Sequence, residues 1–442
     1  NVIFFVSQRD DGVFGLKKMI RVNAGLFWLG LTLVVVANIR ILGDQRSVKW
    51  DAFDQWWNHF RWMGSSLRQG YFPDFFPHLM SGYPLGAEIQ AGVYNILYLA
   101  VAYIFPDCLL SINAIYLMSQ LGIYVLGYNI GITYALKPAA SVYLGLALVA
   151  SGFVIGHASH LSYLASAVGL LACFLGIRKS LAGQHTLGAI CAALGTYHAL
   201  SAGYPAVVSF GAQCLFLYWG FMLFSYPGLR HHCLSVALAA IVGVVLSLPA
   251  LAHTLLFIFQ TDRGAGLTTE HVLSGSMPIY SLANMALPIW KMRFSEPTME
   301  RFHLLFISLP LLGVAIWASL VKRNIARRQL FTWGFFSIFC TLLALGGNDV
   351  LGIRAALADN LYVYRLGRFP SGEHRGFALF ALALLSAFGL SWLLEQEKLK
   401  IGLVVSLLAI DFLLVAYGLQ SMRVGKPDES YRGTVAIYQA SF

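Results

Sequence analysis

The most informative property of this 442-residue sequence is its shortage of charge. Only 11% of the residues are Asp, Glu, Lys or Arg, whereas a soluble globular protein has about a quarter. Hydrophobic residues make up 58% of the chain. This composition excludes a soluble enzyme, a disordered protein and a coiled coil. It predicts an all-α polytopic membrane protein.

Two further absences narrow the range of functions. The six cysteines form no CxxC pair and no zinc-binding spacing, so neither a redox site nor a zinc site is predicted. No signal peptide is visible, because a basic stretch within 9–21 runs into the first apolar segment without a small-residue cleavage site. The basic run KRNIARR at 322–328 is interpreted as a topology signal and not as a nucleic-acid site.

Eleven segments approach the length of about 20 apolar residues that crosses a bilayer as a helix. They lie at 22–42, 108–131, 139–156, 160–177, 186–202, 204–224, 233–257, 303–320, 330–346, 375–394 and 401–420. A twelfth run, 89–105, is short and ends at Pro106. If it does not cross, the connections on the N-terminal side carry 14 Lys and Arg and four acids, as the positive-inside rule requires. We therefore predict eleven transmembrane helices plus a re-entrant or interfacial segment.

This topology places the N-terminus in the cytoplasm and the C-terminus outside, in a bacterial inner or plasma membrane. The predicted parts are a cytoplasmic segment 1–21, a transmembrane domain 22–420 with outer loops 43–107, 258–302 and 347–374, and an outer tail 421–442. Long ordered loops on one face of a helix bundle usually carry the function. We therefore expect the functional site on the outer face.

The first outer loop contains an amphipathic pattern, WDAFDQWWNHFRWMGSSLR at 50–68. At about 100° per residue Phe53, Trp56, Trp57 and Phe60 share one arc. The opposite arc holds Asp51, Asp54, Gln55, Asn58, Arg61 and Ser65, joined only by Trp62. This predicts an amphipathic juxtamembrane helix with its aromatic face at the membrane interface. A simple interfacial anchor also explains the aromatic residues, but anchors carry Lys and Arg on the polar face. Two carboxylates and an arginine favour a functional role.

That polar face suits transfer of a group from a lipid phosphate. A carboxylate at the membrane surface can take a proton from an incoming hydroxyl. An arginine nearby can hold a phosphate leaving group through its planar fork of donors. A divalent metal stays open as a cofactor, although a single Asp pair is a thin ligand set.

Several motifs resemble the YfhO-like membrane proteins, which belong to the GT-C glycosyltransferase superfamily. The resemblance is carried by DAFDQ with Asp51 and Gln55, by the Gly–x–Pro element within QGYFPDFFPHLMSGYPLG, and by AGVYNILYLAVAYIFP with Asn95. Further along, SGFVIGHASHLSYL and RLGRFPSGEHR are similar to the family's Gly–His and Arg–x–Pro–x–Arg regions. The order of these motifs covers roughly 20–420. Family members usually continue into a β-rich outer domain, of which the tail after 421 is a possible stub.

The resemblance implies a GT-C-like fold and a polyprenyl-phosphate-linked sugar as donor. It also implies that an acid in the first outer loop acts as general base. Asp51 matches that position, and Asp54, one turn on, is the second candidate. The alternative for Asp51 is that it only caps the helix.

The remaining candidates form a predicted substrate-binding set at the outer ends of the helices. Its members are Gln55, Arg61, Tyr83, His157, His160, Arg365, Arg368, His374 and Arg375. The alternative for the histidines is that they are ordinary hydrogen-bonded polar residues at the ends of helices. The arginines are costly at a lipid-facing mouth without an anion, and we expect a lipid phosphate there. Their alternatives are headgroup contact or pairing with Glu373 and Asp359.

Three functions follow from this sequence. The leading one is an inverting glycosyltransferase that moves a sugar from a polyprenyl phosphate to a cell-envelope or protein acceptor. The second is an inactive GT-C-like scaffold that serves as a structural subunit of a larger membrane complex. The third, a lipid or solute transporter, is disfavoured by the one-sided distribution of polar residues and by the lack of visible internal repeats.

Overall fold

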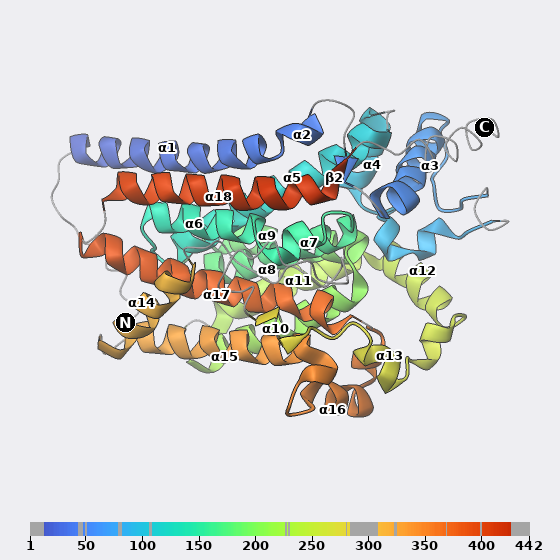
Figure 1. The fold of residues 1–442 in the computed structure, drawn as a ribbon. Coiled ribbons are helices and arrows are strands. Elements are labelled where there is room, and N and C mark those ends of the chain that lie inside the picture. Colours follow the sequence, from blue (N-terminus) through green and yellow to red (C-terminus); the bar gives the residue numbers. More distant parts are fainter. Residues whose placement is uncertain are drawn as a thin grey trace.

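The computed structural model describes most of the chain and consists almost entirely of helices (Figure 1). The described residues are 13–42, 47–48, 51–77, 82–105, 108–225, 228, 230–279, 281–282, 308–321, 325–367, 369–397 and 400–425. The helices are α1 Val13–Ala37, α2 Ile39–Leu42, α3 Trp57–Arg68, α4 Ile96–Ile104, α5 Cys108–Thr133, α6 Pro138–Val149, α7 Gly152–Gly156, α8 Leu161–Leu181, α9 His185–Ala202, α10 Pro205–Ser225, α11 Arg230–Leu246, α12 Leu248–Ile258, α13 Thr269–Leu273, α14 Ser308–Val321, α15 Ile325–Leu345, α16 Ile353–Asn360, α17 Pro370–Glu395 and α18 Ile401–Arg423. Shorter turns are η1 Ala52–Trp56, η2 Leu85–Ala87, η3 Ile89–Ala91, η5 Asp262–Ala265, η7 Gly346–Asn348 and η8 Tyr362–Arg365, and the two strands are β1 Ser47–Val48 and β2 Val424–Gly425.

This architecture confirms the predicted all-α polytopic membrane protein. Within the described residues, six helical stretches are long and apolar enough to cross a membrane, or seven if α11 and α12 form one bent span. The six are Cys108–Thr133, Pro138–Gly156, Leu161–Leu181, Pro205–Phe224, Gln329–Asn348 and Gly372–Glu395. All eleven predicted segments contain helix, so the count of eleven stays a prediction compatible with this structure.

The predicted span 233–257 is broken, and the segment 89–105 is too short to cross. Helices α11 and α12 meet at an angle of 65°, because Pro249 stands in the first turn of α12 and cannot continue the preceding helix. Helix α4 has nine residues, which span about 14 Å of a hydrocarbon core of about 30 Å. The prediction that 89–105 does not cross is consistent with this length.

The aromatic face of α3 packs against protein and not only against lipid. Trp56, Phe60 and Met63 are at most 2% exposed, and the rings of Trp56 and Phe60 lie 5.8 and 5.7 Å from that of Tyr98 in α4. The predicted amphipathic helix therefore exists, but the short helix α4 covers part of its apolar face. This packing fixes the direction of the polar face, which begins at Asp51.

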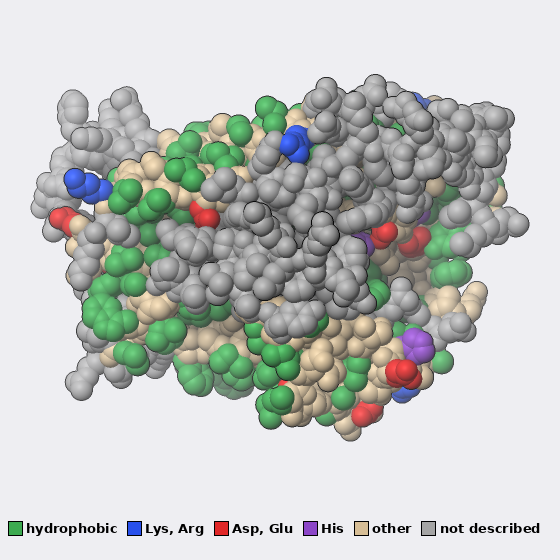
Figure 2. Space-filling model, in the orientation of Figure 1, with side chains coloured by type: hydrophobic (Ala, Val, Ile, Leu, Met, Phe, Trp, Pro, Cys, Tyr) green, Lys and Arg blue, Asp and Glu red, His purple; other side chains and the backbone are tan. Residues whose placement is uncertain are grey.

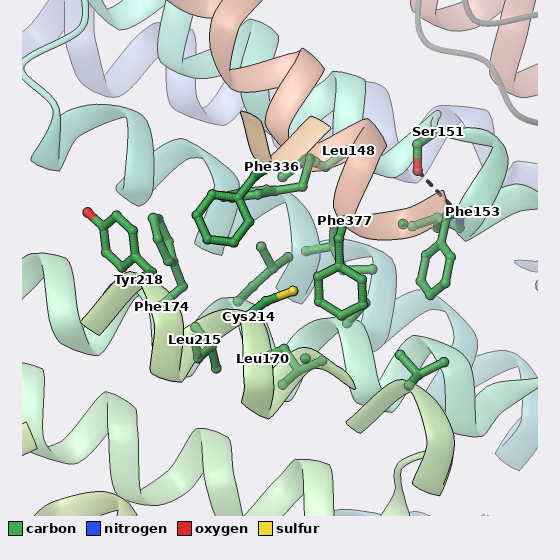
Figure 3. A pocket seen from close by; sticks show the side chains of 18 of the residues that line it. Leu148, Ser151, Phe153, Leu170, Phe174, Cys214, Leu215, Tyr218, Phe336 and Phe377 are labelled. Atoms are coloured by element: carbon green, nitrogen blue, oxygen red, sulfur yellow. Dashed lines mark hydrogen bonds between the residues drawn. The ribbon is translucent and has the colours of Figure 1, made fainter. Parts of the chain in front are cut away.

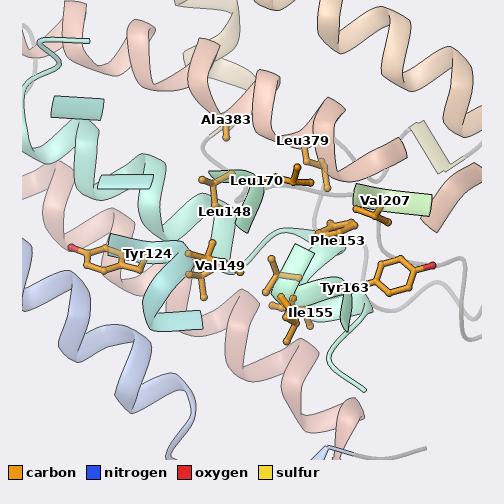
Figure 4. Close-up of a cluster of buried hydrophobic side chains, with 14 of the residues drawn as sticks. Tyr124, Leu148, Val149, Phe153, Ile155, Tyr163, Leu170, Val207, Leu379 and Ala383 are labelled. Atoms are coloured by element: carbon orange, nitrogen blue, oxygen red, sulfur yellow. The ribbon is translucent and has the colours of Figure 1, made fainter. Parts of the chain in front are cut away.

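The centre of the bundle is the stretch Pro138–Gly156, formed by α6 and α7 and completely buried by its neighbours. Figure 4 shows the apolar side chains around it, among them Leu148, Val149 and Phe153, together with Leu379 of α17. Dispersion contacts among such side chains hold membrane helices together where lipid is as apolar as they are. The central stretch ends at His157, which places that residue at the inner wall of the candidate site.

Helices α8 and α9 approach each other through glycine. A side-chain carbon on Gly176 would come within 2.7 Å of the Gly188 carbonyl oxygen, and Gly169 would come equally close to the Gly195 carbonyl oxygen. Small residues spaced along one face allow such close contact between membrane helices. His160 stands just before α8, the first helix of this pair.

One end of the bundle carries the shorter elements α3, α4, α12, α13 and α16, and we call it the site end (Figure 1). Helices α1 and α18 lie side by side and both finish there, where β1 pairs antiparallel with β2. On the face in Figure 2, acidic and histidine side chains gather toward this end, and much of the remaining described surface is hydrophobic. Helices α3, α4, α13 and α16 come from the loops predicted to lie on the outer face, and the side of the membrane that the site end faces stays a prediction.

Candidate active site

Asp51 pairs with His160 at the site end. Its Oδ2 lies 2.9 Å from His160 Nε2, and the two side chains are 45% and 31% exposed. The hydrogen bond from His160 lowers the pKa of the Asp51 carboxyl, against the opposing effect of partial burial. Asp51 stands directly before η1 and makes no side-chain capping bond. The capping alternative is therefore not what its side chain does in this structure.

His160 continues into a chain of side chains that reaches α17. His160 Nδ1 lies 3.5 Å from Nδ1 of His157, and His157 Nε2 accepts a 3.0 Å hydrogen bond from Arg375. The His157 ring stacks on Tyr163 with centroids 4.0 Å apart. Arg375 is 1% exposed. Residues from three separated parts of the sequence thus form one connected unit, which we call the Asp51–Arg375 chain.

A second carboxylate, Glu88, lies in the segment between η2 and η3 and was not among the sequence candidates. Gln55 Nε2 and the Tyr83 hydroxyl each donate to it at 2.8 Å, and His59 Nε2 lies 4.0 Å away. The Glu88 side chain is 19% exposed. Burial, followed by the charge of Glu88, raises the pKa of Tyr83, and burial lowers the pKa of His59. Both Gln55 and Tyr83 were predicted at the site, and Glu88 is the group that joins them.

A buried ion pair lies on the other side of the Asp51–Arg375 chain. Arg354 of α16 and Glu373 of α17 are 3.4 Å apart and at most 2% exposed. The Arg354 guanidinium also lies over the Tyr364 ring, 4.9 Å from its centroid. Burial raises the pKa of Tyr364 to about 12. Glu373 was the expected partner of a nearby arginine, and that arginine is Arg354, which the sequence motifs did not identify.

The remaining predicted residues lie apart from the Asp51–Arg375 chain. Arg365 is half-buried and donates from Nε to the Leu267 carbonyl oxygen at 3.2 Å. Within the described residues its two terminal nitrogens have no hydrogen-bond partner. His374 is 2% exposed beneath Phe210, whose ring centroid lies 4.1 Å from that of His374. Arg61 is half-buried on α3. The side chain of Asp54 and all of Arg368 lie outside the described residues.

Two apolar cavities lie inside the bundle beside this site. The first cavity has a volume of about 110 Å³. Its lining includes the aromatic side chains of Phe153, Phe174, Phe336 and Phe377, together with Leu170 and Leu215 (Figure 3). Phe153 also contacts His157, with ring centroids 5.3 Å apart, so this cavity borders the Asp51–Arg375 chain. The second, of about 460 Å³, lies among α8, α9, α10 and α11 and shares Leu170 and Leu215 with the first. Both suit hydrocarbon.

No group of three or more His, Cys, Asp or Glu side chains among the described residues has the arrangement of a metal site. At the site end, the positive charges among the described residues that could bind an anion are arginine side chains. The described acids there are single carboxylates and do not form a cluster.

No family model and no curated protein matches this chain. Among solved structures it is similar to the cryo-EM structure of the arabinofuranosyltransferase AftD from Mycobacteria, with a TM-score of 0.51 and 12% sequence identity. The match covers 95% of this chain and 28% of that one. The chain therefore shares the fold of part of a membrane glycosyltransferase. This agrees with the GT-C-like fold expected from the motifs, and the YfhO-like assignment stays a prediction.

Proposed function

We propose that this chain is a membrane glycosyltransferase that moves a sugar from a polyprenyl-phosphate donor to a hydroxyl acceptor of the cell envelope or of a protein. The observation that carries the proposal is the Asp51 carboxylate, half-exposed at the site end and oriented by His160 at 2.9 Å. The shared fold with AftD and the apolar cavities beside the site support it.

Asp51 acts as the general base in this proposal. A base must be ionised when the acceptor arrives, and the lowered pKa of Asp51 keeps it so at neutral pH. Its carboxylate removes the proton of the acceptor hydroxyl, the freed oxygen forms a bond to the anomeric carbon, and the carbon–oxygen bond to the phosphate breaks. The electron pair leaves with the lipid phosphate. Attack and departure on opposite sides of the sugar invert the anomeric centre.

Arg365 is the residue that we propose for binding the leaving phosphate, because the described contacts use only its Nε. Its Nε is anchored on the Leu267 carbonyl oxygen, which leaves the flat end of the guanidinium to bind two oxygens of one phosphate. Arg375, by contrast, is buried and directed at His157. We therefore assign phosphate binding to Arg365, with the neighbouring Arg368 as a second donor, and keep Arg375 out of direct phosphate contact.

The hydrocarbon of the donor lies in the larger apolar cavity among α8 to α11. Its lining is almost entirely apolar, and the hydroxyl of Thr196 is already paired with the thiol of Cys173 at 3.4 Å. An isoprenoid chain would lose no polar contacts there and would gain dispersion contacts with the four helices.

The test uses the full chain in lipid nanodiscs with a panel of polyprenyl phosphates that carry different radiolabelled sugars. Loss of label from the lipid to acceptor or water is expected for one member of the panel. Asp51→Asn should then lower the rate by about 10²- to 10⁴-fold, the range that general-base catalysis supplies.

The matched control is Asp359→Asn. Asp359 is another acid of the site end, and it accepts a hydrogen bond from the Thr269 hydroxyl. Its substitution should leave transfer unchanged. Full activity of Asp51→Asn would overturn the proposed base.

A second function, that of a structural subunit in a larger membrane complex, is favoured by one observation. The buried arginine Arg354 of the site end is paired with the buried carboxylate of Glu373. A scaffold without substrate would satisfy its charges internally in this way. It predicts stoichiometric co-purification with other membrane proteins, and no transfer from any lipid-linked sugar.

A further inference from the structure

The Asp51–Arg375 chain has a direction that the chemistry of its end residue determines. Arginine donates hydrogen bonds and accepts none, so His157 Nε2, 3.0 Å from Arg375, must be the unprotonated nitrogen of its ring. A neutral His157 then carries its proton on Nδ1. That proton points at His160 Nδ1, 3.5 Å away, which must accept it. His160 in turn carries its proton on Nε2 and donates it to Asp51.

We propose that Arg375 positions the catalytic base Asp51 through His157 and His160, by fixing which nitrogen of each histidine carries the proton. The catalytic role of Asp51 in this inference rests on the proposed function. The positions of the histidine protons follow from the geometry alone. Arg375, His157 and His160 are positioning residues. None of them needs to contact the substrate for this role.

The surroundings of His157 hold its ring in the plane that the chain requires. Tyr163 stacks on it at 4.0 Å, and Tyr204 stacks on Tyr163 at 4.3 Å. On α17, a side-chain carbon at Gly372 would lie 3.3 Å from His157 Cε1 and 3.4 Å from Nε2. The ring therefore cannot rotate to exchange its two nitrogens without displacing Tyr163, so packing fixes the orientation of the ring and Arg375 fixes which nitrogen carries the proton.

The chain orients Asp51 but cannot carry its proton away. A relay would need a group at the far end that releases or accepts a proton, and the guanidinium of Arg375 stays protonated at any physiological pH. A second proton on His160 Nδ1 would face the proton of His157, and it would add a positive charge on the side of Arg375. The chain therefore directs the Nε2 proton of His160 at the Asp51 carboxylate and leaves Nδ1 of His160 as the acceptor. The proton that Asp51 takes from an acceptor leaves to water, to which the half-exposed carboxylate has access.

One competing contact lies beside the chain. The Ser159 hydroxyl is 3.4 Å from His160 Nδ1 and can donate to the same nitrogen. Such a bond would also keep His160 protonated on Nε2, without any contribution from Arg375. The experiment must therefore separate Arg375 from Ser159.

The first experiment reads the protons directly and needs no substrate. The full chain, labelled with ¹⁵N-histidine and held in nanodiscs, is compared by NMR with H157Q and H160Q, whose missing signals assign the two rings. We expect a directly bonded proton on Nδ1 of His157 and on Nε2 of His160. Arg375→Met should remove the proton from Nδ1 of His157, and Arg375→Lys, which restores an obligate donor, should return it.

Two control variants complete this experiment. Ser159→Ala should leave the proton on the same nitrogen of His157 and of His160 as in the wild type. Arg178→Gln changes a half-buried arginine near the other end of α8, about 27 Å along the helix from His160, and should also change nothing. A proton on Nε2 of wild-type His157, or unchanged rings in Arg375→Met, would overturn the proposal.

A second experiment links the chain to catalysis. With the lipid-linked sugar that the panel identifies, Arg375→Met should lower kcat by up to about 100-fold with KM unchanged, because misplacing a catalytic group costs up to this much. Arg375→Lys should recover part of the loss. A rise in KM at constant kcat would instead make Arg375 a phosphate ligand and contradict its positioning role. If no sugar is transferred at all, the proposed function is wrong. The NMR experiment then still shows whether Arg375 determines which nitrogen of each histidine carries the proton.

Discussion

Two carboxylate pairs of the site end use similar groups in opposite ways. Asp51 and His160 are 2.9 Å apart, 45% and 31% exposed, and Glu373 and Arg354 are 3.4 Å apart and at most 2% exposed. An exposed pair contributes little to stability and stays available to a substrate. A buried pair is held away from both water and substrate, and breaking it leaves a charge without a partner.

Glu88 lies between these extremes at 19% exposure, held by Gln55 and Tyr83. The three acids therefore form a series in which exposure rises from Glu373 to Glu88 to Asp51. If exposure separates structural from chemical roles, then stability should depend on these acids in that order. Activity should depend most on the last. Four substitutions test this ordering.

The largest loss of stability is expected from Arg354→Met. It leaves the buried Glu373 carboxylate without its cation, and we expect the free energy of unfolding to fall by about 3–5 kcal/mol. Tryptophan fluorescence during unfolding in mixed detergent micelles would measure this. The double variant Arg354→Met/Glu373→Leu should recover most of the loss, because an apolar pair of similar volume needs no ionic partner. Equal losses in the single and double variants would show that the ion pair is not the cause.

A smaller loss is expected from Gly367→Ala. The added methyl group would meet the Glu373 carboxylate, while the Gly367 carbonyl oxygen accepts from Arg354 at 3.4 Å. Overpacking of this kind costs about 1–3 kcal/mol. The same unfolding measurement applies, with Gly334→Ala in α15 as control, because nothing lies within 4 Å of the added carbon there. A neutral result at Gly367 would mean that the buried pair can move aside.

Glu88→Gln should have an intermediate effect. The amide still accepts one hydrogen bond but loses the charge that strengthens the bonds from Gln55 and Tyr83, which we expect to cost about 1 kcal/mol. Removing the charge of Glu88 also removes one cause of the raised pKa of Tyr83. A pH titration of tyrosine absorbance should therefore show one tyrosine ionising at lower pH than in the wild type. An unchanged titration would argue against the contact.

Asp51→Asn should change stability least, by less than about 1 kcal/mol, because the pair with His160 is half exposed. The pKa of Asp51 is lowered in the folded protein, so its small contribution is present above its ordinary pKa. That contribution is lost as the pH falls through the lowered value. Unfolding measured between neutral and acidic pH should therefore depend less on pH in Asp51→Asn than in the wild type. A large loss at neutral pH would place Asp51 with the structural acids.

Much of the fold could be predicted from hydropathy because lipid leaves few alternatives to helix. The break between α11 and α12 was missed, since the apolar run continues through Ser247, and Pro249 was the available signal. The burial of the α3 aromatic face was also missed. An aromatic face that packs on α4 has the same periodicity as one that lies in lipid.

The candidate site could be predicted in its members but not in its connections. Asp51, His157, His160 and Arg375 all stood in the predicted set, yet their order in space depends on three helices that are distant in sequence. Glu88 and Arg354 were missed, because each is a single charge with no motif around it. Glu88 is the lone acid in an otherwise uncharged stretch, 75–106, and that isolation was the signal that could have found it.

The Asp51–Arg375 chain also has a consequence for biosynthesis. Its last contact joins residues 218 positions apart, and ribosomes add about 5–20 residues per second. About 10–40 s therefore pass between the synthesis of His157 and the synthesis of Arg375. During that interval α17 is missing, and the histidines have no fixed proton arrangement. A truncated or partly inserted chain would hold its carboxylate at the surface without orientation, so the reaction would begin only when the bundle has closed.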